Sequence, residues 1–311
     1  MSSNILALPA LRKQVLLHTA VRFQGFLGLL IVFMLGVALA PVNDETNLFL
    51  DVTNQMNILR YVAETGIIAI GMTLVILTGG IDLSVGAVLV SGAAFGFVNG
   101  AVSSAFRIPS FVVTLAMMSF ARGLARLVFG GVAIPLLAIS QGGAAPENAF
   151  FVNLRLGGVL PVPALLMFGV AIVASLALRY TPFGRHVYAV GGNPVAAHLS
   201  GVRVEFTKVL VFALCGVLTA LAAFVHAIQL NQGAPNDGFA YELNAIAAVV
   251  IGGTSLQGGI GTVAGAVAGA WMLGMIDNIL NLNNVQADVQ LLIKGALIVV
   301  AVALQRLQRR A

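Results

Sequence analysis

Residues 181–208 read TPFGRHVYAVGGNPVAAHLSGVRVEFTK and form the longest polar interruption in the second half of a very apolar chain. Within them, Asn193 is a good helix N-cap, because its side-chain oxygen can accept from a free backbone N–H of the first turn. Pro194 suits the first helical position, and Gly201 can adopt the left-handed conformation that ends a helix. We therefore expect a short helix here, against the simpler alternative of a plain connecting loop.

The composition places the rest of the chain in a membrane. Of its 311 residues, 59% are hydrophobic and only 9% are charged, whereas soluble domains carry about 25% charged residues. Apolar runs of about 20 residues, long enough to cross the hydrocarbon core, recur along the chain. We predict an all-α integral membrane protein, a polytopic helical bundle of about nine to ten spans with some broken or short helices, forming one transmembrane domain over residues 1–311.

Basic residues cluster at the ends of the apolar runs, so the net charge of +5 indicates orientation and not nucleic-acid binding. Arg179, Arg185, Arg203 and Lys208 flank the predicted short helix, and loops rich in Lys and Arg stay on the cytoplasmic side. Residues 181–208 are therefore expected to form a cytoplasmic loop. The single cysteine, Cys215, lies in an apolar run and is expected to serve packing.

Two of the apolar segments are interrupted by paired glycines. The expected spans are 23–40, 61–78 continuing as 81–98, 111–131, 161–178, 209–230, 260–280 and 290–304, with a short helix at 243–254. Glycine-interrupted segments in corresponding halves of a transporter indicate the translocation path. The candidate path residues are Gly79, Gly80, Asp82, Ser84, Arg122, Gly252, Gly253 and Thr254. For Asp82, local capping of the following helix is favoured over contact with a solute.

Four motifs carry a resemblance to a known family. They are GMTLVILTGGIDLSVG at 71–86, TLAMMSFARGLA at 114–125, YAVGGNPVAA at 188–197 and YELNAIAAVVIGGTSLQGGIG at 241–261. Together they resemble the permease (transmembrane) subunits of bacterial monosaccharide ABC importers of the ribose, xylose, arabinose and galactose type. The resemblance implies that the short helix is a coupling helix, which docks on an ATP-hydrolysing subunit. The residues it assigns to that role are Gly192, Asn193, Pro194, Val195, Ala196, Ala197, Leu199, Ser200 and Gly201.

The chain has no phosphate-binding G-x-x-x-x-G-K-[ST] loop and no Cys/His cluster with metal-ligand spacing. The resemblance therefore implies a transport subunit that is not itself an enzyme, with ATP and Mg²⁺ bound by a separate ABC ATPase. It also implies a second permease subunit, identical or not, a periplasmic sugar-binding protein, and a multi-pass location in the bacterial inner membrane. Two alternatives remain open: a stand-alone secondary transporter or channel for a small polar solute, and an inactive or scaffold subunit.

The chain departs from the family in one place. Between Gly86 and Phe111 there is room for one span, where the family has two. Loss of one crossing would reverse the orientation of everything on one side of it. A re-entrant segment, an inverted N-terminal part or an inactive product would each account for the difference.

Overall fold

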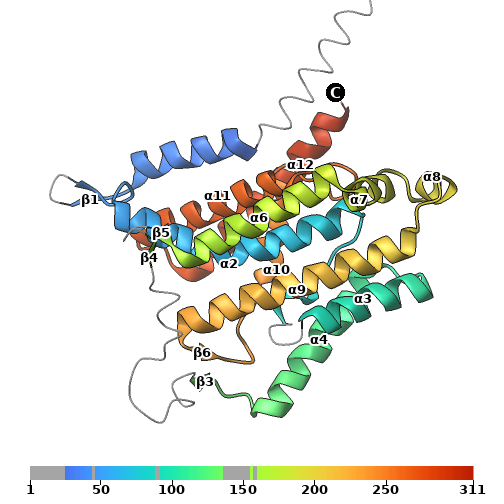
Figure 1. Ribbon diagram of the computed structural model, residues 1–311. Coiled ribbons are helices and arrows are strands. Elements are labelled where there is room, and N and C mark those ends of the chain that lie inside the picture. The colour runs from blue at the N-terminus through green and yellow to red at the C-terminus, as the bar shows by residue number, and fades with distance from the viewer. Residues whose placement is uncertain (1–24, 44–45, 88–91, 136–154, 157–159, 311) are drawn as a thin grey trace, which may run out of the picture.

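The computed structural model describes residues 25–43, 46–87, 92–135, 155–156 and 160–310. These residues are mainly helical, which confirms the all-α prediction (Figure 1). The only strands among them are three two-residue antiparallel pairings, which are β1 (Val42–Asn43) with β2 (Thr46–Asn47), β3 (Ile134–Pro135) with β6 (Gln232–Gly233), and β4 (Arg155–Leu156) with β5 (Leu160–Pro161).

Five helices are long and apolar enough to cross a membrane, namely α2 (Val52–Leu77), α4 (Ser110–Phe129), α6 (Val162–Tyr180), α9 (Val204–Leu230) and α11 (Val263–Leu282). The helix Gly25–Leu39, α3 (Gly92–Phe106) and α10 (Tyr241–Ile251) are shorter and also apolar. The remaining helices are α7 (Pro182–Gly192), α8 (Pro194–Leu199) and α12 (Ala287–Arg310).

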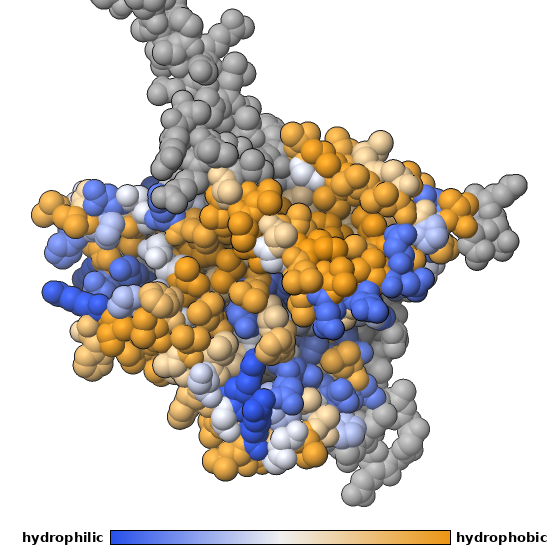
Figure 2. Space-filling model, turned by 180° about the vertical axis from the view of Figure 1, so that it is seen from behind, coloured by the Kyte–Doolittle hydropathy of each residue, from blue (hydrophilic) through white to orange (hydrophobic). Residues whose placement is uncertain are grey.

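Helix α2 lies at the centre of the bundle, and α6, α9, α10 and α11 pack around it. Its residues Ile67, Ile70 and Met72 have no exposed surface. The surrounding helices expose large apolar side chains instead; Leu127 is 82% and Val173 68% exposed. Figure 2 shows hydrophobic side chains over most of one face of the molecule. Apolar surface on this scale is what contact with lipid requires.

The helices run between two ends of the molecule. Figure 1 shows α7 and α8 at one end, called here the α8 end, and β1, β4, β5 and β6 at the other, called the strand end. Helix α2 begins at the strand end, where Asp51 accepts a hydrogen bond from the Asn54 backbone N–H at 3.0 Å. The second span therefore begins at Val52, and the prediction that it starts at Tyr61 after a polar loop was wrong.

The predicted continuation of this span through residues 81–98 was also wrong. After α2 the chain forms a 3₁₀ turn, η1 (Ser84–Gly86), and the next described helix is α3 (Gly92–Phe106). Gly79, just after α2, and Pro109, just before α4, line the same cavity at the α8 end. The chain thus leaves and returns to one end of the bundle between Thr78 and Pro109. This arrangement favours the re-entrant alternative, and the later spans keep their orientation.

Glycines allow α10 and α11 to pack with their backbones in contact. A Cβ atom at Gly269 would collide with the carbonyl oxygen of Ala248, and one at Gly265 with that of Gly252. Small residues permit such approach between helices in lipid. Gly265 and Gly269 therefore bring the backbones of these two helices into contact.

Candidate coupling surface and polar interior

The predicted short helix is present as α8, and its ends are formed by the expected residues. The side-chain oxygen of Asn193 accepts from the backbone N–H groups of Val195 and Ala196, both at 3.0 Å. At the other end Gly201 has a φ of 86°, and the N–H of Val202 donates to the carbonyl of Ala197 at 3.0 Å. These bonds satisfy groups that a short helix otherwise leaves free.

One side of α8 is attached to the protein and the other side is exposed. Ala197 is 5% exposed and packs with Val190 of α7 and Val204 of α9. Val195 and Leu199 are 68% and 82% exposed. Of the residues that the resemblance assigns to docking, Ala197 is therefore corrected to an internal anchor of the helix, while Val195 and Leu199 point outwards.

The segment before α8, expected to be loop, is the helix α7. Thr181 caps it by accepting from the Gly184 backbone N–H at 3.4 Å, and Pro182 occupies its first turn. The last turn of α7 contacts the end of α2 and the loop after α10. A Cβ atom at Gly191 would collide with the Leu77 carbonyl oxygen of α2 and would lie 2.5 Å from the Gly259 nitrogen in that loop.

The two glycine breaks meet at this point, and we call Leu77, Gly79, Gly191, Gly258 and Gly259 the glycine junction. The Gly259 N–H donates to the Leu77 carbonyl at 2.9 Å. A Cβ atom at Gly258 would lie 3.0 Å from the Gly79 nitrogen and 2.9 Å from the Gly191 carbonyl oxygen. The end of α2, the loop after α10 and the residues preceding α8 are thus joined through their backbones.

Tyr188 strengthens the link between α7 and the second break. Its hydroxyl donates to the carbonyl of Gly261 at 2.9 Å, across 73 residues of sequence. Thus α7, which leads directly into α8, is held to the loop between α10 and α11 by a side-chain hydrogen bond as well as by the glycine junction.

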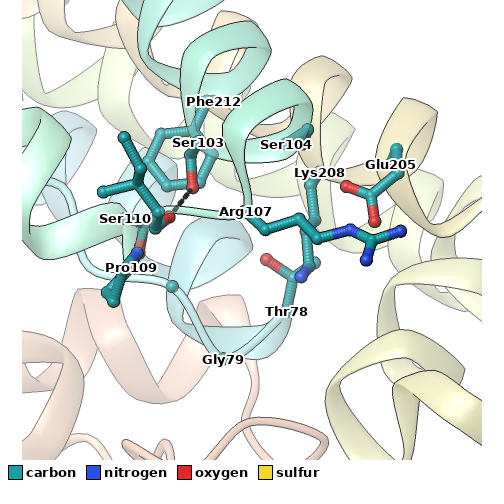
Figure 3. A pocket seen from close by; sticks show the side chains of 12 residues that line it. Thr78, Gly79, Ser103, Ser104, Arg107, Pro109, Ser110, Glu205, Lys208 and Phe212 are labelled. Carbon is teal, nitrogen blue, oxygen red and sulfur yellow. Dashed lines mark hydrogen bonds between the residues drawn. The ribbon is translucent and has the colours of Figure 1, made fainter.

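A cavity of about 300 Å³ lies at the same end, between the re-entrant segment and the start of α9 (Figure 3). Arg107 lines it from the turn before α4, and Glu205 and Lys208 line it from α9. The Ser103 hydroxyl donates to the Ile108 carbonyl at 2.8 Å and closes the turn after α3. Of the basic residues expected at this end, Lys208 therefore lines a polar cavity, together with Arg107.

Asp82 and Ser84 form a local structure within the re-entrant segment. One Asp82 oxygen accepts from the Ser84 backbone N–H at 2.9 Å and from its hydroxyl at 2.6 Å. The Asn99 side chain donates to the Ser84 hydroxyl at 2.9 Å and ties η1 to α3. Asp82 is 1% exposed. Asp82 thus bonds to the first residue of η1, whose N-cap position is occupied by Leu83.

The other candidate path residues lie in two separate places. Gly252 packs against Gly265 of α11, while Gly253 has a φ of 91° and precedes the buried Thr254. These three residues lie in the same loop as Gly258 and Gly259 of the glycine junction. Arg122 lies on α4 with its guanidinium 5.7 Å from the centre of the Phe239 ring. Its charge acts on Glu242, whose side chain lies against Gly86 of η1.

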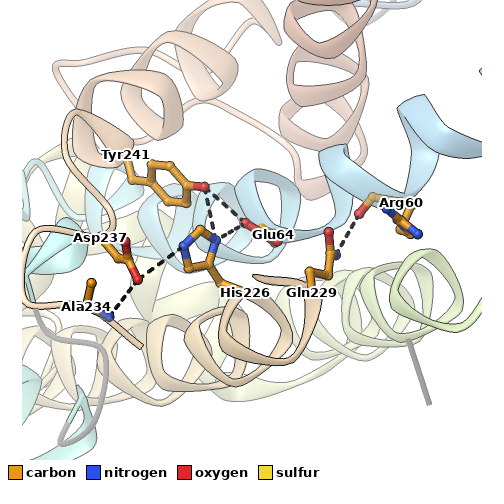
Figure 4. Close-up of polar contacts among 7 residues, drawn as sticks. All are labelled: Arg60, Glu64, His226, Gln229, Ala234, Asp237 and Tyr241. Carbon is orange, nitrogen blue, oxygen red and sulfur yellow. Dashed lines mark hydrogen bonds and ion pairs between the residues drawn. The ribbon is translucent and has the colours of Figure 1, made fainter. Parts of the chain in front are cut away.

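The structure adds a polar cluster that sequence reasoning missed (Figure 4). His226 Nδ1 lies 2.8 Å from Glu64 Oε2, and the Tyr241 hydroxyl donates to the same oxygen at 3.1 Å. His226 Nε2 faces Asp237 at 3.9 Å. The cluster joins α2, α9 and α10 inside the bundle.

A signal for this cluster was present in the sequence. Glu64 is the only acidic residue within α2, and ionisable residues inside a span are functional candidates by default. The acid had no visible partner, because His226 lies 162 positions away. Two other polar contacts join helices: Lys294 Nζ lies 2.9 Å from Asp277, and the Asn278 side chain donates to Asn54 at 2.8 Å.

Comparisons with known proteins identify the class. Residues 89–302 match the family described as branched-chain amino acid transport system / permease component. The chain belongs to this family, and is therefore a multi-pass membrane transport subunit and not an enzyme.

Individual relatives indicate which kind of transport subunit the chain is similar to. The ribose import permease protein RbsC of Bacillus subtilis is 39% identical over 306 residues, covering 90% of this chain and 91% of the relative. RbsC of Escherichia coli K12 is 37% identical, covering 86% and 89%. The xylose transport system permease protein XylH of Haemophilus influenzae is 31% identical, covering 91% and 96%. No solved structure matches. The relatives bear out the resemblance to sugar-importer permeases and do not favour a stand-alone transporter or channel.

Proposed function

We propose that this chain is the permease subunit of an ATP-binding-cassette importer, which carries a ribose-like pentose or a hexose across the bacterial inner membrane. The names of the relatives support the substrate class. The observation that carries the coupling role is the arrangement at the α8 end. There, an exposed capped helix is connected through α7 to the ends of both broken segments.

The charges at the α8 end support a cytoplasmic position for α8. Arg107, Arg179, Arg185, Arg203 and Lys208 all lie in or beside the segments at this end. Positive side chains of short loops are retained in the cytoplasm. The strand end would then face the periplasm, where a sugar-binding protein delivers its ligand.

The coupling mechanism follows from the contacts of α8. A separate ABC ATPase, which binds ATP and Mg²⁺, docks on the exposed side formed by Val195 and Leu199. Closure of the ATPase displaces α8 and, through Ala197, also α7 and the start of α9. The glycine junction passes this displacement to the end of α2 and to the loop before α11. In a pair of permease subunits, these movements open the path alternately to each side.

Leu199→Glu tests this proposal. The substitution places a charge on a side chain that is 82% exposed, so the fold and membrane insertion are expected to persist. Co-purification with the ATPase and ATP-driven sugar uptake should both fall at least about tenfold, because an unpaired charge in an apolar docking surface costs more than 1.4 kcal/mol.

His186→Glu is the matched control, since His186 is exposed on α7 and lies outside the docking side. It should leave both measurements near those of the unmodified protein. Undiminished uptake by Leu199→Glu, at equal amounts in the membrane, would overturn the assignment of α8 as the docking helix.

A further inference from the structure

A second cavity, of about 420 Å³, lies between α2, α10 and α11. It is in the strand-end half of the bundle, since it is lined by the first part of α2 and the last part of α11. Its polar lining consists of Asn57, Tyr61, Thr65, Asn244, Asp277, Asn278 and Asn281. So many polar side chains around one space within membrane helices need an explanation, because polar groups at membrane depth are costly.

The spacing of these residues along α2 and α11 places their side chains on the helix faces that line the cavity. Asn57, Tyr61 and Thr65 follow one another at intervals of four residues and share one face of α2. Asp277 and Asn281 have the same spacing on α11. The cavity is thus a feature built from two helical faces, with Asn244 of α10 completing it.

Several of these groups have hydrogen-bonding capacity that the described part of the protein does not use. No side-chain hydrogen bond joins Asn57, Thr65 or Asn244 to another described residue. Asp277 Oδ1 is buried and also lacks a partner there, while Oδ2 is 2.9 Å from Lys294 Nζ. Buried polar groups are normally satisfied, so the unpaired Asp277 oxygen favours an occupant that supplies a hydrogen-bond donor.

The rest of the lining is apolar. Ile58, Val62, Ala270 and Leu273 lie beside the polar groups. A monosaccharide has this same division, with a rim of hydroxyl groups and less polar ring faces. The cavity volume falls within the usual range for small-molecule sites, roughly 300–1,000 Å³. Lys294 balances the charge of Asp277, which favours a neutral occupant over a cation.

We propose that this cavity binds the transported monosaccharide on its way through the permease, with Asn57, Thr65, Asn244 and Asp277 Oδ1 bonding its hydroxyl groups. This inference rests on the proposed function and deepens it. The selectivity of transport would then depend on the permease as well as on the protein that delivers the sugar.

The experiment replaces polar groups by apolar groups of similar shape. Thr65→Val and Asn244→Leu remove hydroxyl and amide groups without opening a large void, and apolar side chains are tolerated in a membrane bundle. Thr53→Val is the control, because Thr53 is exposed at the start of α2 and lies outside the cavity. Uptake of labelled D-ribose and D-xylose is measured in cells that depend on this permease, together with its amount in the membrane and its association with the ATPase.

We expect the double variant to take up sugar at least about tenfold more slowly, at unchanged amount and assembly, since each lost hydrogen bond weakens binding several-fold. The control should match the unmodified protein. Unchanged uptake by the double variant overturns the cavity assignment and leaves the proposed function standing. Failure of the unmodified protein to take up either sugar overturns the pentose part of the proposed substrate class, and the assignment of this cavity to a pentose with it.

Discussion

Substitution of Gly191 by alanine tests the glycine junction directly. A Cβ atom at this position would collide with the Leu77 carbonyl oxygen and lie 2.5 Å from the Gly259 nitrogen. Both obstacles are backbone atoms, so no side-chain rotation relieves the collision. Forcing an extra carbon into a close-packed site costs about 1–3 kcal/mol. The same displacement would separate α7 from both broken segments and weaken coupling.

The neighbouring glycine provides the control. A Cβ atom at Gly192 would meet nothing within 4 Å. Both residues end α7, so both substitutions carry a similar gain in helix propensity, up to about 1 kcal/mol. Any difference between Gly191→Ala and Gly192→Ala therefore reports the junction and not the propensity of the helix.

The assays are thermal unfolding of the detergent-purified protein and ATP-driven uptake in membranes. Gly191→Ala should unfold at a lower temperature than Gly192→Ala and transport at least about fivefold more slowly, the factor that corresponds to 1 kcal/mol. Equal stability and equal transport for the two variants would refute the argument that α7 transmits force through backbone contact.

Two further predictions follow from single contacts. Asn193→Ala removes the bonds to the first turn of α8 and should destabilise this helix by about 1 kcal/mol, measured as faster amide hydrogen exchange in residues 195–199. Asn193→Asp, which retains an acceptor, should restore protection, and exchange unaffected by the alanine would contradict the capping role. His226→Ala leaves Glu64 with Tyr241 as its remaining partner and should destabilise the bundle by about 3 kcal/mol. Glu64→Gln keeps both neighbours and should cost about 1 kcal/mol. Thermal unfolding in detergent compares the two variants, and equal losses of stability would argue against a charged pair.

The sequence was informative where structure depends on neighbouring residues. Helix α8 could be predicted because its signals, Asn193, Pro194 and Gly201, lie within nine positions of one another. The long apolar runs likewise indicated the spans, since hydrophobic length is a local property.

The sequence was misleading where contacts between distant residues determine the local structure. Helix α7 contains Gly184, Gly191 and Gly192, which suggest a loop, but Gly184 lets its first turn lie against the backbone of Leu178, and Val187 is fully buried. The polar start of α2 resembled a loop for a similar reason. Asn54 is helical there because Asp51 caps the turn, and its side chain pairs with Asn278, 224 positions away.

The candidate site could be predicted only in part. The glycine breaks were visible as pairs, but their meeting with Gly191 depends on how three segments fold together. Glu64 and His226 each appeared as isolated ionisable residues. Their pairing arises only when α2 and α9 pack side by side, and no spacing in the sequence indicates it.

The return of the chain to the α8 end between Thr78 and Pro109 has a consequence for how proteins of this kind can vary. A segment that starts and finishes on one side of the membrane can change in length, or gain or lose a pair of crossings, without inverting anything that follows. Insertion of a single extra crossing elsewhere before α6 would place α8 on the opposite side of the membrane from the ATPase that is proposed to dock on it. Length variation that preserves transport is therefore expected to concentrate in this segment.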